Sequence, residues 1–128
     1  MVHVAAGSPF SSAERVGLEQ TIRKAEELSR AEFSVFVGSS DDDSHAFATQ
    51  LHNSLVAPTR SILIMVDPGK RVVEVVTGAW VRLTLRDQQA ELAVAAMQSE
   101  FARGDLVGGL RRGIQMLAEH ARAPESLH

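Results

Sequence analysis

The chain has 128 residues, of which 45% are hydrophobic and 23% are charged, and its formal net charge is −3. This length and balance are typical of a single globular domain that buries its own core. The absence of cysteine excludes disulfides, thiolate metal sites and cysteine nucleophiles. Because the chain is weakly acidic and no basic cluster is larger than the pair at 111–112, we expect no nucleic-acid partner.

Membrane and secretory signals are also missing from the sequence. No apolar run approaches the roughly 18 residues that a membrane span needs. The first nine residues lack the positive region and apolar stretch of a signal peptide. We therefore expect a cytoplasmic protein without a membrane span, and the removal of a leader or an anchor is left open.

The first thirty residues divide into an arm and a helix. Residues 1–10 have no hydrophobic periodicity and predict a flexible arm. Ser11 and Glu14 have the spacing of a capping box, in which each side chain bonds a free backbone N–H of the other residue. Apolar residues then recur every three or four positions, which predicts a helix over 12–30.

A strand and a second helix follow. The β-branched and aromatic residues of 33–37 predict a strand that ends at a glycine. Residues 39–43 are polar and acidic and predict a loop. Phe47 and Leu51 share one face of a second helix, and Pro58 ends that region because proline and its preceding residue disfavour helix.

Residues 61–66 and 72–76 give the clearest strand patterns in the chain. The four residues 67–70 between them read Asp-Pro-Gly-Lys, which predicts a type II turn with positive φ at Gly69. The two strands therefore form a hairpin. Their nearly continuous apolar character predicts burial on both faces of the sheet.

The last third of the chain predicts two helices after a short segment at 79–85. Asp87 is expected to cap a helix that ends near Arg103, and because that helix is apolar almost all round we expect it to lie centrally. The last helix begins near Asp105, and residues 124–128 form a tail. Four glycines offer close helix contact: Gly104, Gly108, Gly109 and Gly113.

These elements predict one α/β domain over 11–123, with a three-layer α/β/α sandwich around a small mixed β-sheet. The first two strands and the helix between them form a right-handed parallel unit, and the hairpin adds an antiparallel strand. This topology places the loops 38–43 and 67–70 at one end of the sheet. The segments 57–60 and 77–80 lie at the other end.

Three consecutive aspartates, Asp41, Asp42 and Asp43, form the strongest charge feature. Together with Asp67 at the same sheet end, their carboxylates are candidate ligands for Ca²⁺ or Mg²⁺. The alternative interpretation, which we favour, is a solvated loop in which Asp43 or Ser44 caps the second helix.

No catalytic or nucleotide-binding motif occurs in the sequence. The five histidines form no metal-binding pair, and we expect His45 and His52 on an exposed helix face. Gly78 and Trp80 follow the third predicted strand. They are candidates for a ligand site in which Gly78 lets the backbone approach the ligand closely and the Trp80 ring forms one side of the site. The alternative is a turn with positive φ at Gly78 and with Trp80 packed on the edge of the core.

Three segments carry a family resemblance: Val-Val-Glu-Val-Val-Thr-Gly at 72–78, Leu-Arg-Asp at 85–87, and Phe-Ala-Arg-Gly-Asp-Leu-Val-Gly-Gly-Leu-Arg-Arg-Gly-Ile at 101–114. The chain resembles the TPM domain from about Ser11 to Ala121, and looks most similar to a compact actinobacterial branch. The resemblance implies the same sandwich fold. It also implies two activities known of other members, an acid phosphatase activity and divalent-cation binding, or a role as an accessory protein.

The resemblance points to five family-site positions: Arg60, Thr77, Gly78, Trp80 and Asp105. Many TPM domains carry Asp-Asn-Gly before the second strand, where this chain has Ala-Pro-Thr-Arg-Ser at 57–61. This chain therefore lacks the carboxylate of that motif and has the positively charged Arg60 instead, which disfavours cation binding at this site. We therefore expect no catalytic residues and a non-enzymatic binding or assembly module with an unknown protein partner.

Two alternatives stay open at this point. One is a weak metal-dependent acid phosphatase that uses Asp105, Thr77 and Arg60, or the acidic loop at the other sheet end. The other is a Ca²⁺-binding module that uses only the acidic loop.

Overall fold

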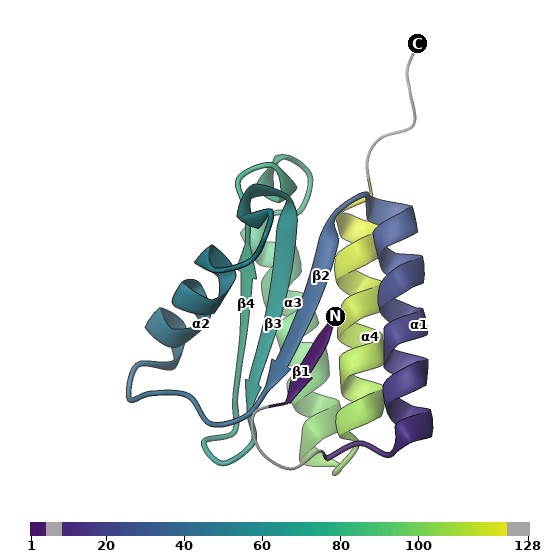
Figure 1. Ribbon diagram of the computed structural model, residues 1–128, viewed down its shortest axis with the longest axis vertical. Coiled ribbons are helices and arrows are strands. Elements are labelled where there is room, and N and C mark those ends of the chain that lie inside the picture. Colours follow the sequence, from purple (N-terminus) through teal and green to yellow (C-terminus); the bar gives the residue numbers. More distant parts are fainter. Residues whose placement is uncertain (5–8, 123–128) are drawn as a thin grey trace.

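The computed structural model describes residues 1–4 and 9–122. Four helices, four strands and two short 3₁₀ helices lie within these residues (Figure 1). In chain order they are β1 (Val2–Val4), α1 (Ser12–Ser29), β2 (Glu32–Val37), α2 (Ser44–Asn53), η1 (Pro58–Arg60), β3 (Ser61–Asp67), β4 (Val72–Thr77), η2 (Val81–Leu83), α3 (Asp87–Ala102) and α4 (Leu106–His120).

The strands form one mixed sheet in the order β1-β2-β3-β4. The first three strands are parallel, and β4 pairs antiparallel with β3. Helices α1, α3 and α4 cover one face of the sheet, while α2 alone packs on the other face, over β3 and β4 (Figure 1). The predicted three-layer α/β/α sandwich around a mixed sheet is confirmed.

Strand β1 lies in the segment that the sequence predicts to be a flexible arm, so that prediction is wrong for residues 2–4. Val2 pairs with Val35 of β2. On the outer edge, the Val2 N–H donates to Glu19 Oε1 at 2.9 Å and the Val2 carbonyl accepts from Arg15 at 2.8 Å. A three-residue strand is too short to show periodicity, and its partners lie far along the chain. The prediction is also wrong at Phe10, which is buried in the hydrophobic core. Residues 5–8 of the predicted arm and the predicted tail, 124–128, lie outside the described residues.

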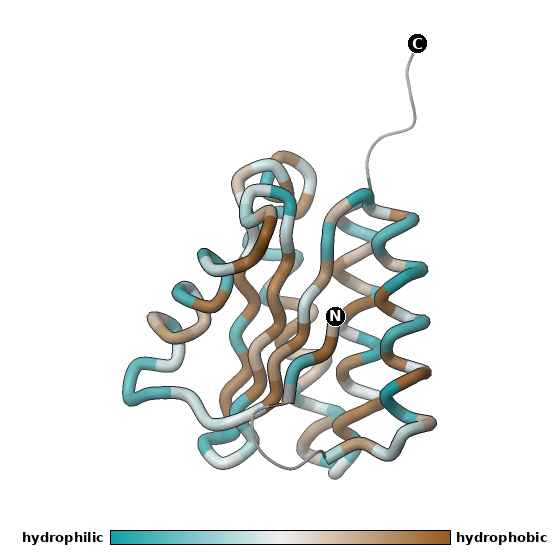
Figure 2. Tube along the Cα trace, in the orientation of Figure 1, coloured by the Kyte–Doolittle hydropathy of each residue, from teal (hydrophilic) through white to brown (hydrophobic). Residues whose placement is uncertain are grey.

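The central helix of the three-helix layer is α4, not α3. Helix α4 packs against both α1 and α3, and it buries Leu110, Ile114 and Leu117 completely. Helix α3 buries only Ala93 and Met97, and Leu92 is 60% exposed. The hydropathy of α3 misleads because most of its apolar residues are alanines, which solvent tolerates on a helix surface. Figure 2 shows the apolar residues concentrated on the strands and on the sheet-facing sides of the helices.

Two of the α4 glycines are needed for this packing, as the sequence predicts. A Cβ at Gly109 would overlap the Phe101 ring, and a Cβ at Gly113 would overlap Met97. The side chains of α3 therefore occupy the space that small residues on α4 leave open.

The β3–β4 hairpin and the start of α3 differ from the predicted local geometry. Among the described glycines only Gly104 has a positive φ, so the predicted type II turn at Gly69 is wrong. The Arg71 N–H instead donates to the Pro68 carbonyl at 3.3 Å, and Arg71 has a φ of 57°. Helix α3 is capped one residue earlier than predicted, because the Arg86 N–H donates to the Gln89 side chain at 2.9 Å.

Burial of the hairpin also differs between its two strands. Every residue of β3 is buried, as predicted, because both helical layers cover it. In β4 only Val73 is buried and the other residues are partly exposed, since β4 is an edge strand. In the part of the chain that the structure describes, no helix is both long and apolar enough to cross a membrane.

Candidate functional site

The acidic end of the sheet, defined as Asp41, Asp42, Asp43 and Asp67, is held together around the Asp67 carboxylate. The Ser40 N–H and hydroxyl both donate to Asp67 Oδ2 at 2.7 Å, and the Lys70 N–H donates to Oδ1 at 3.1 Å. The Lys70 ammonium also donates to the Asp41 carbonyl. The predicted meeting of the two loops at one sheet end is therefore confirmed.

Asp67 is buried and ionised. Burial by itself would raise the pKa of its carboxyl group. The hydrogen bonds from Ser40 and Lys70, together with the positive charge of Lys70, outweigh that effect and hold the pKa below its ordinary value. Both carboxylate oxygens thus accept hydrogen bonds from the protein itself, and Asp67 links the two loops.

Asp43 caps α2, as the favoured interpretation predicts. The Ala46 N–H donates to Asp43 Oδ1 at 3.0 Å. Asp41 and Asp42 are exposed. Across residues 1–4 and 9–122, no three histidine or carboxylate side chains converge as a group that would hold a metal ion. Binding of Ca²⁺ or Mg²⁺ by the acidic end stays a prediction.

The acidic end gives a testable prediction. We expect Asp43→Ala to lower the free energy of unfolding by about 1 kcal/mol through loss of the cap. Asp41→Asn and Asp42→Asn should each change it by no more than about 0.5 kcal/mol, because these side chains are exposed. Thermal or urea unfolding measures both effects. Ca²⁺ should bind no more tightly than the millimolar range. Micromolar Ca²⁺ affinity that the double Asn variant loses would contradict this interpretation.

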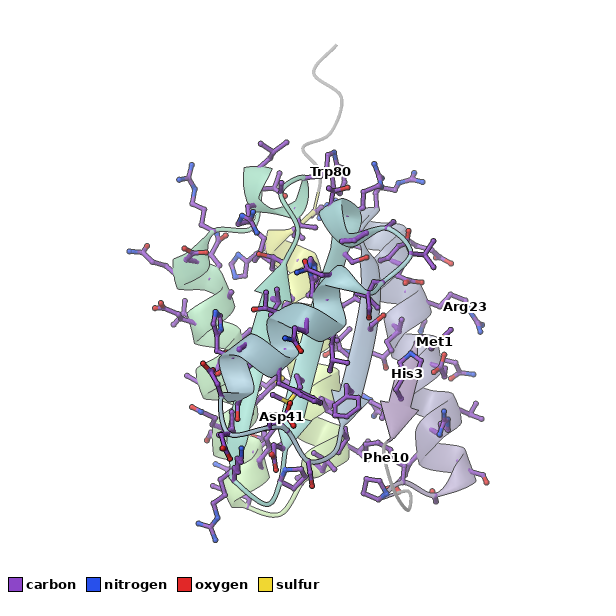
Figure 3. All side chains as sticks on the ribbon, turned by 60° about the vertical axis from the view of Figure 1, so that its left-hand side comes forward. Met1, His3, Phe10, Arg23, Asp41 and Trp80 are labelled. Atoms are coloured by element: carbon purple, nitrogen blue, oxygen red, sulfur yellow. The ribbon has the colours of Figure 1, made fainter. Side chains whose placement is uncertain are left out.

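The opposite sheet end, here called the arginine–tryptophan end, consists of Val56, Arg60, Trp80, Arg82 and Leu83 (Figure 3 shows Trp80 at one end and Asp41 at the other). The Arg60 guanidinium carbon lies 4.1 Å from the centroid of the Trp80 ring, a cation–π stack. Trp80 is half-buried and packs against the hydrophobic core. Its packing on the core edge, the favoured prediction, is confirmed.

Two apolar side chains at this end are open to solvent. Val56 is fully exposed and Leu83 is 76% exposed. The Arg60 guanidinium also donates to the Arg30 carbonyl at 3.2 Å, and the Arg82 guanidinium donates to the Thr77 carbonyl. The end therefore combines exposed apolar groups, one aromatic ring and arginines held in fixed positions.

Gly78 joins the two backbone segments of this end. Its N–H donates to the Ser61 carbonyl at 3.0 Å, and the Trp80 N–H donates to the Thr59 carbonyl at 3.0 Å. The predicted positive φ is wrong, because Gly104 is the only described glycine with positive φ. Glycine is required for a different reason: a Cβ would overlap the carbonyl oxygens of Pro58 and Thr59. The close approach involves the protein's own backbone and not a ligand.

Asp105 does not join the other family-site positions. It caps α4 by accepting from the Gly108 N–H at 2.8 Å. Its neighbours Gly104 and Leu106 line one cavity together with Asp67, which places Asp105 at the acidic end of the sheet (Figure 1). The predicted grouping of Asp105 with Thr77 and Arg60 is therefore wrong, because the chain from α3 turns into α4 at the far end of the sheet.

The histidines of α2 differ from each other, contrary to the prediction that both are exposed. His45 is exposed and its Nδ1 lies 3.0 Å from Glu74 Oε1. His52 is 5% exposed, and its Nε2 lies 3.0 Å from the Ser61 carbonyl oxygen. The sequence carries a signal for this burial: His52 follows Ala48 by four residues, which places it on the face of α2 that packs against the sheet.

Curated relatives of this chain come from Mycobacterium tuberculosis. The chain is 31% identical over 110 residues to the uncharacterized protein Rv2468c and equally to the uncharacterized protein MT2543 of another strain. The matched segment is 86% of this chain and 66% of each relative. The chain thus spans slightly less than two thirds of the length of these relatives.

Solved structures share the fold at low sequence identity. BA42 from Bizionia argentinensis has a TM-score of 0.81 at 19% identity, covering 91% of this chain and 84% of its own. The N-terminal domain of a protein from P. gingivalis has a TM-score of 0.76 at 20% identity, covering 97% of this chain and 87% of its own. The N-terminal domain of cg2496 from Corynebacterium glutamicum has a TM-score of 0.76 at 15% identity, covering 98% and 83%. Residues 2–118 match DUF5130, described as a domain of unknown function, and the chain belongs to that family.

Proposed function

We propose that this DUF5130 domain is a TPM-like binding module of the actinobacterial type that acts in the cytoplasm without catalysing a reaction. Its partner is a protein with an acidic surface, and the arginine–tryptophan end is the contact site. The observation that carries the proposal is the stack of Arg60 on Trp80 beside exposed apolar side chains.

This composition is typical of residues that dominate protein–protein binding. Trp and Arg are the side chains most enriched among energetic hot spots, and apolar neighbours exclude water around them. Trp80 is anchored by the core, and Arg60 is fixed by the ring and by the Arg30 carbonyl. Little side-chain entropy is therefore lost on binding. Glu32, the first residue of β2, is an acidic side chain at the same end of the sheet, and it is exposed to solvent.

Fluorescence provides a direct test, because the chain has one tryptophan and no tyrosine. Fluorescence excited at about 295 nm therefore reports only on Trp80. A 10-fold weakening of binding corresponds to a loss of about 1.4 kcal/mol of binding free energy. We expect polyglutamate, used as an acidic polypeptide probe, to change the emission in a saturable way that weakens with added salt. Arg60→Gln should weaken this binding by about 10-fold or more.

The matched control is Arg23→Gln, which removes an exposed guanidinium of α1 far from Trp80 (Figure 3). This variant should bind like the unmodified chain. Equal loss in both variants would mean that only net charge is sensed and would contradict the proposal. A response to Ca²⁺ in place of polyglutamate would favour the cation-binding alternative. Aryl phosphate turnover well above background that is lost in Asp105→Asn would favour the phosphatase.

A further inference from the structure

A cavity of about 490 Å³ lies between the β3–β4 hairpin and the corner where α3 turns into α4. It is at the acidic end of the sheet, opposite the arginine–tryptophan end (Figure 1). Its size falls within the roughly 300–1,000 Å³ that small-molecule sites occupy. None of the sequence patterns indicates it, since its walls come from two segments about 30 residues apart.

The walls of the cavity are apolar and already fixed by packing. Val73 is 7% exposed, and Phe101 and Leu106 are partly buried side chains that pack against the core. The Phe101 ring occupies the space that Gly109 leaves open on α4. Such walls need no rearrangement to receive an apolar group, which lowers the free-energy cost of binding.

The rim of the cavity carries one available charge. Asp67 and Arg71 are the two ionised residues in the lining. Both Asp67 oxygens accept hydrogen bonds from Ser40 or Lys70, as described above. Arg71 is exposed, and its guanidinium forms no hydrogen bond or ion pair with the residues that the structure describes. Gln98 adds a neutral donor from the α3 side.

The backbone of Arg71 supplies a second, independent observation. Its φ of 57° is in the left-handed region, where glycine is favoured and arginine is uncommon. A hairpin loop of this kind is most stable with glycine at the left-handed position. Strained positions held by a non-glycine residue concentrate at functional sites. The other described non-glycine residue with positive φ, Arg30, ends helix α1, whereas Arg71 places a guanidinium at the mouth of an apolar cavity.

We propose that this cavity binds a small amphiphilic carboxylate. The acyl or aryl part lies against Val73, Phe101 and Leu106, and the carboxylate forms a forked pair with the Arg71 guanidinium. A planar guanidinium matches the two oxygens of a carboxylate, and this pairing gives more geometric specificity than a single point charge. The site is independent of the proposed protein-binding end and leaves Trp80 unaffected.

The test uses decanoate and ¹H–¹⁵N NMR spectra of the whole chain. We expect saturable shifts at the amides of 71–73 and 98–106, and no change at Trp80. Decanol, which lacks the charge, and acetate, which lacks the chain, should each bind at least about 10-fold more weakly, a difference of about 1.4 kcal/mol. Equal binding of decanol would overturn the carboxylate assignment, and equal binding of acetate would overturn the role of the apolar walls.

Two variants keep the test independent of misfolding. Arg71→Gly relieves the left-handed strain, so it should melt at an equal or higher temperature while binding decanoate at least about 10-fold more weakly. Ala102→Leu fills the cavity from an exposed helix position and should block binding with the fold intact. Arg23→Gln is the charge-matched control and should bind normally. Unchanged affinity in Arg71→Gly, or shifts outside the cavity, would overturn the proposal.

Discussion

Gly78→Ala is expected to lower the free energy of unfolding by about 3 kcal/mol, a large effect for one methyl group. The added Cβ would overlap the carbonyl oxygens of Pro58 and Thr59. Backbone atoms cannot rotate away as a flexible side chain can, so η1 must separate from the end of β4. That movement would also break the Gly78 N–H bond to Ser61 and the Trp80 N–H bond to Thr59. Urea denaturation followed by circular dichroism measures the loss.

Gly69→Ala is the matched control for this prediction. A Cβ at Gly69 meets only Asp67 Oδ1, at the ordinary contact distance of 3.4 Å, and the residue has no positive φ. The control should therefore change stability by less than about 0.5 kcal/mol. A large loss of stability in Gly69→Ala would instead support a type II turn, which requires positive φ at Gly69. A Gly78→Ala variant as stable as the unmodified chain would disprove the close approach.

Asp67→Asn should lower the free energy of unfolding by about 2–3 kcal/mol at pH 7. The buried carboxylate accepts from two N–H groups and one hydroxyl. An asparagine amide has one oxygen in place of two, so at least one buried donor loses its acceptor and faces an NH₂ group. Asp42→Asn is the matched control, because it makes the same chemical change on an exposed side chain and should be nearly neutral.

The pH dependence of Asp67 follows from its lowered pKa. An unfolded Asp titrates near pH 3.9, and the folded group titrates lower, so the folded state binds fewer protons between these values. The stabilisation is fully present above about pH 4 and is lost as the pH falls through the folded pKa. The stability gap between the unmodified chain and Asp67→Asn should therefore narrow on acidification. Thermal unfolding of both proteins from pH 7 to pH 2 measures this difference in stability. A difference that does not change with pH would contradict the role of the Asp67 charge.

The sequence by itself determined the features that depend on bonds between near neighbours. Ser11 and Glu14 form the predicted capping box, and Asp43 and Asp105 cap the helices that follow them. Each cap joins residues three positions apart, so the spacing alone specifies it. The continuous apolar run of β3 similarly specifies a strand covered on both faces.

Only the tertiary structure decided the features that depend on distant partners. Strand β1 exists because β2 supplies its hydrogen bonds, and α4 is central because its glycines admit side chains of α3. Gly78 meets a backbone segment about twenty residues earlier, and Asp105 is carried to the sheet end opposite Arg60. The Arg60–Trp80 stack and the cavity at Arg71 likewise join segments far apart in the chain. Such contacts depend on how the layers pack, a long-range property that no local pattern of residues records.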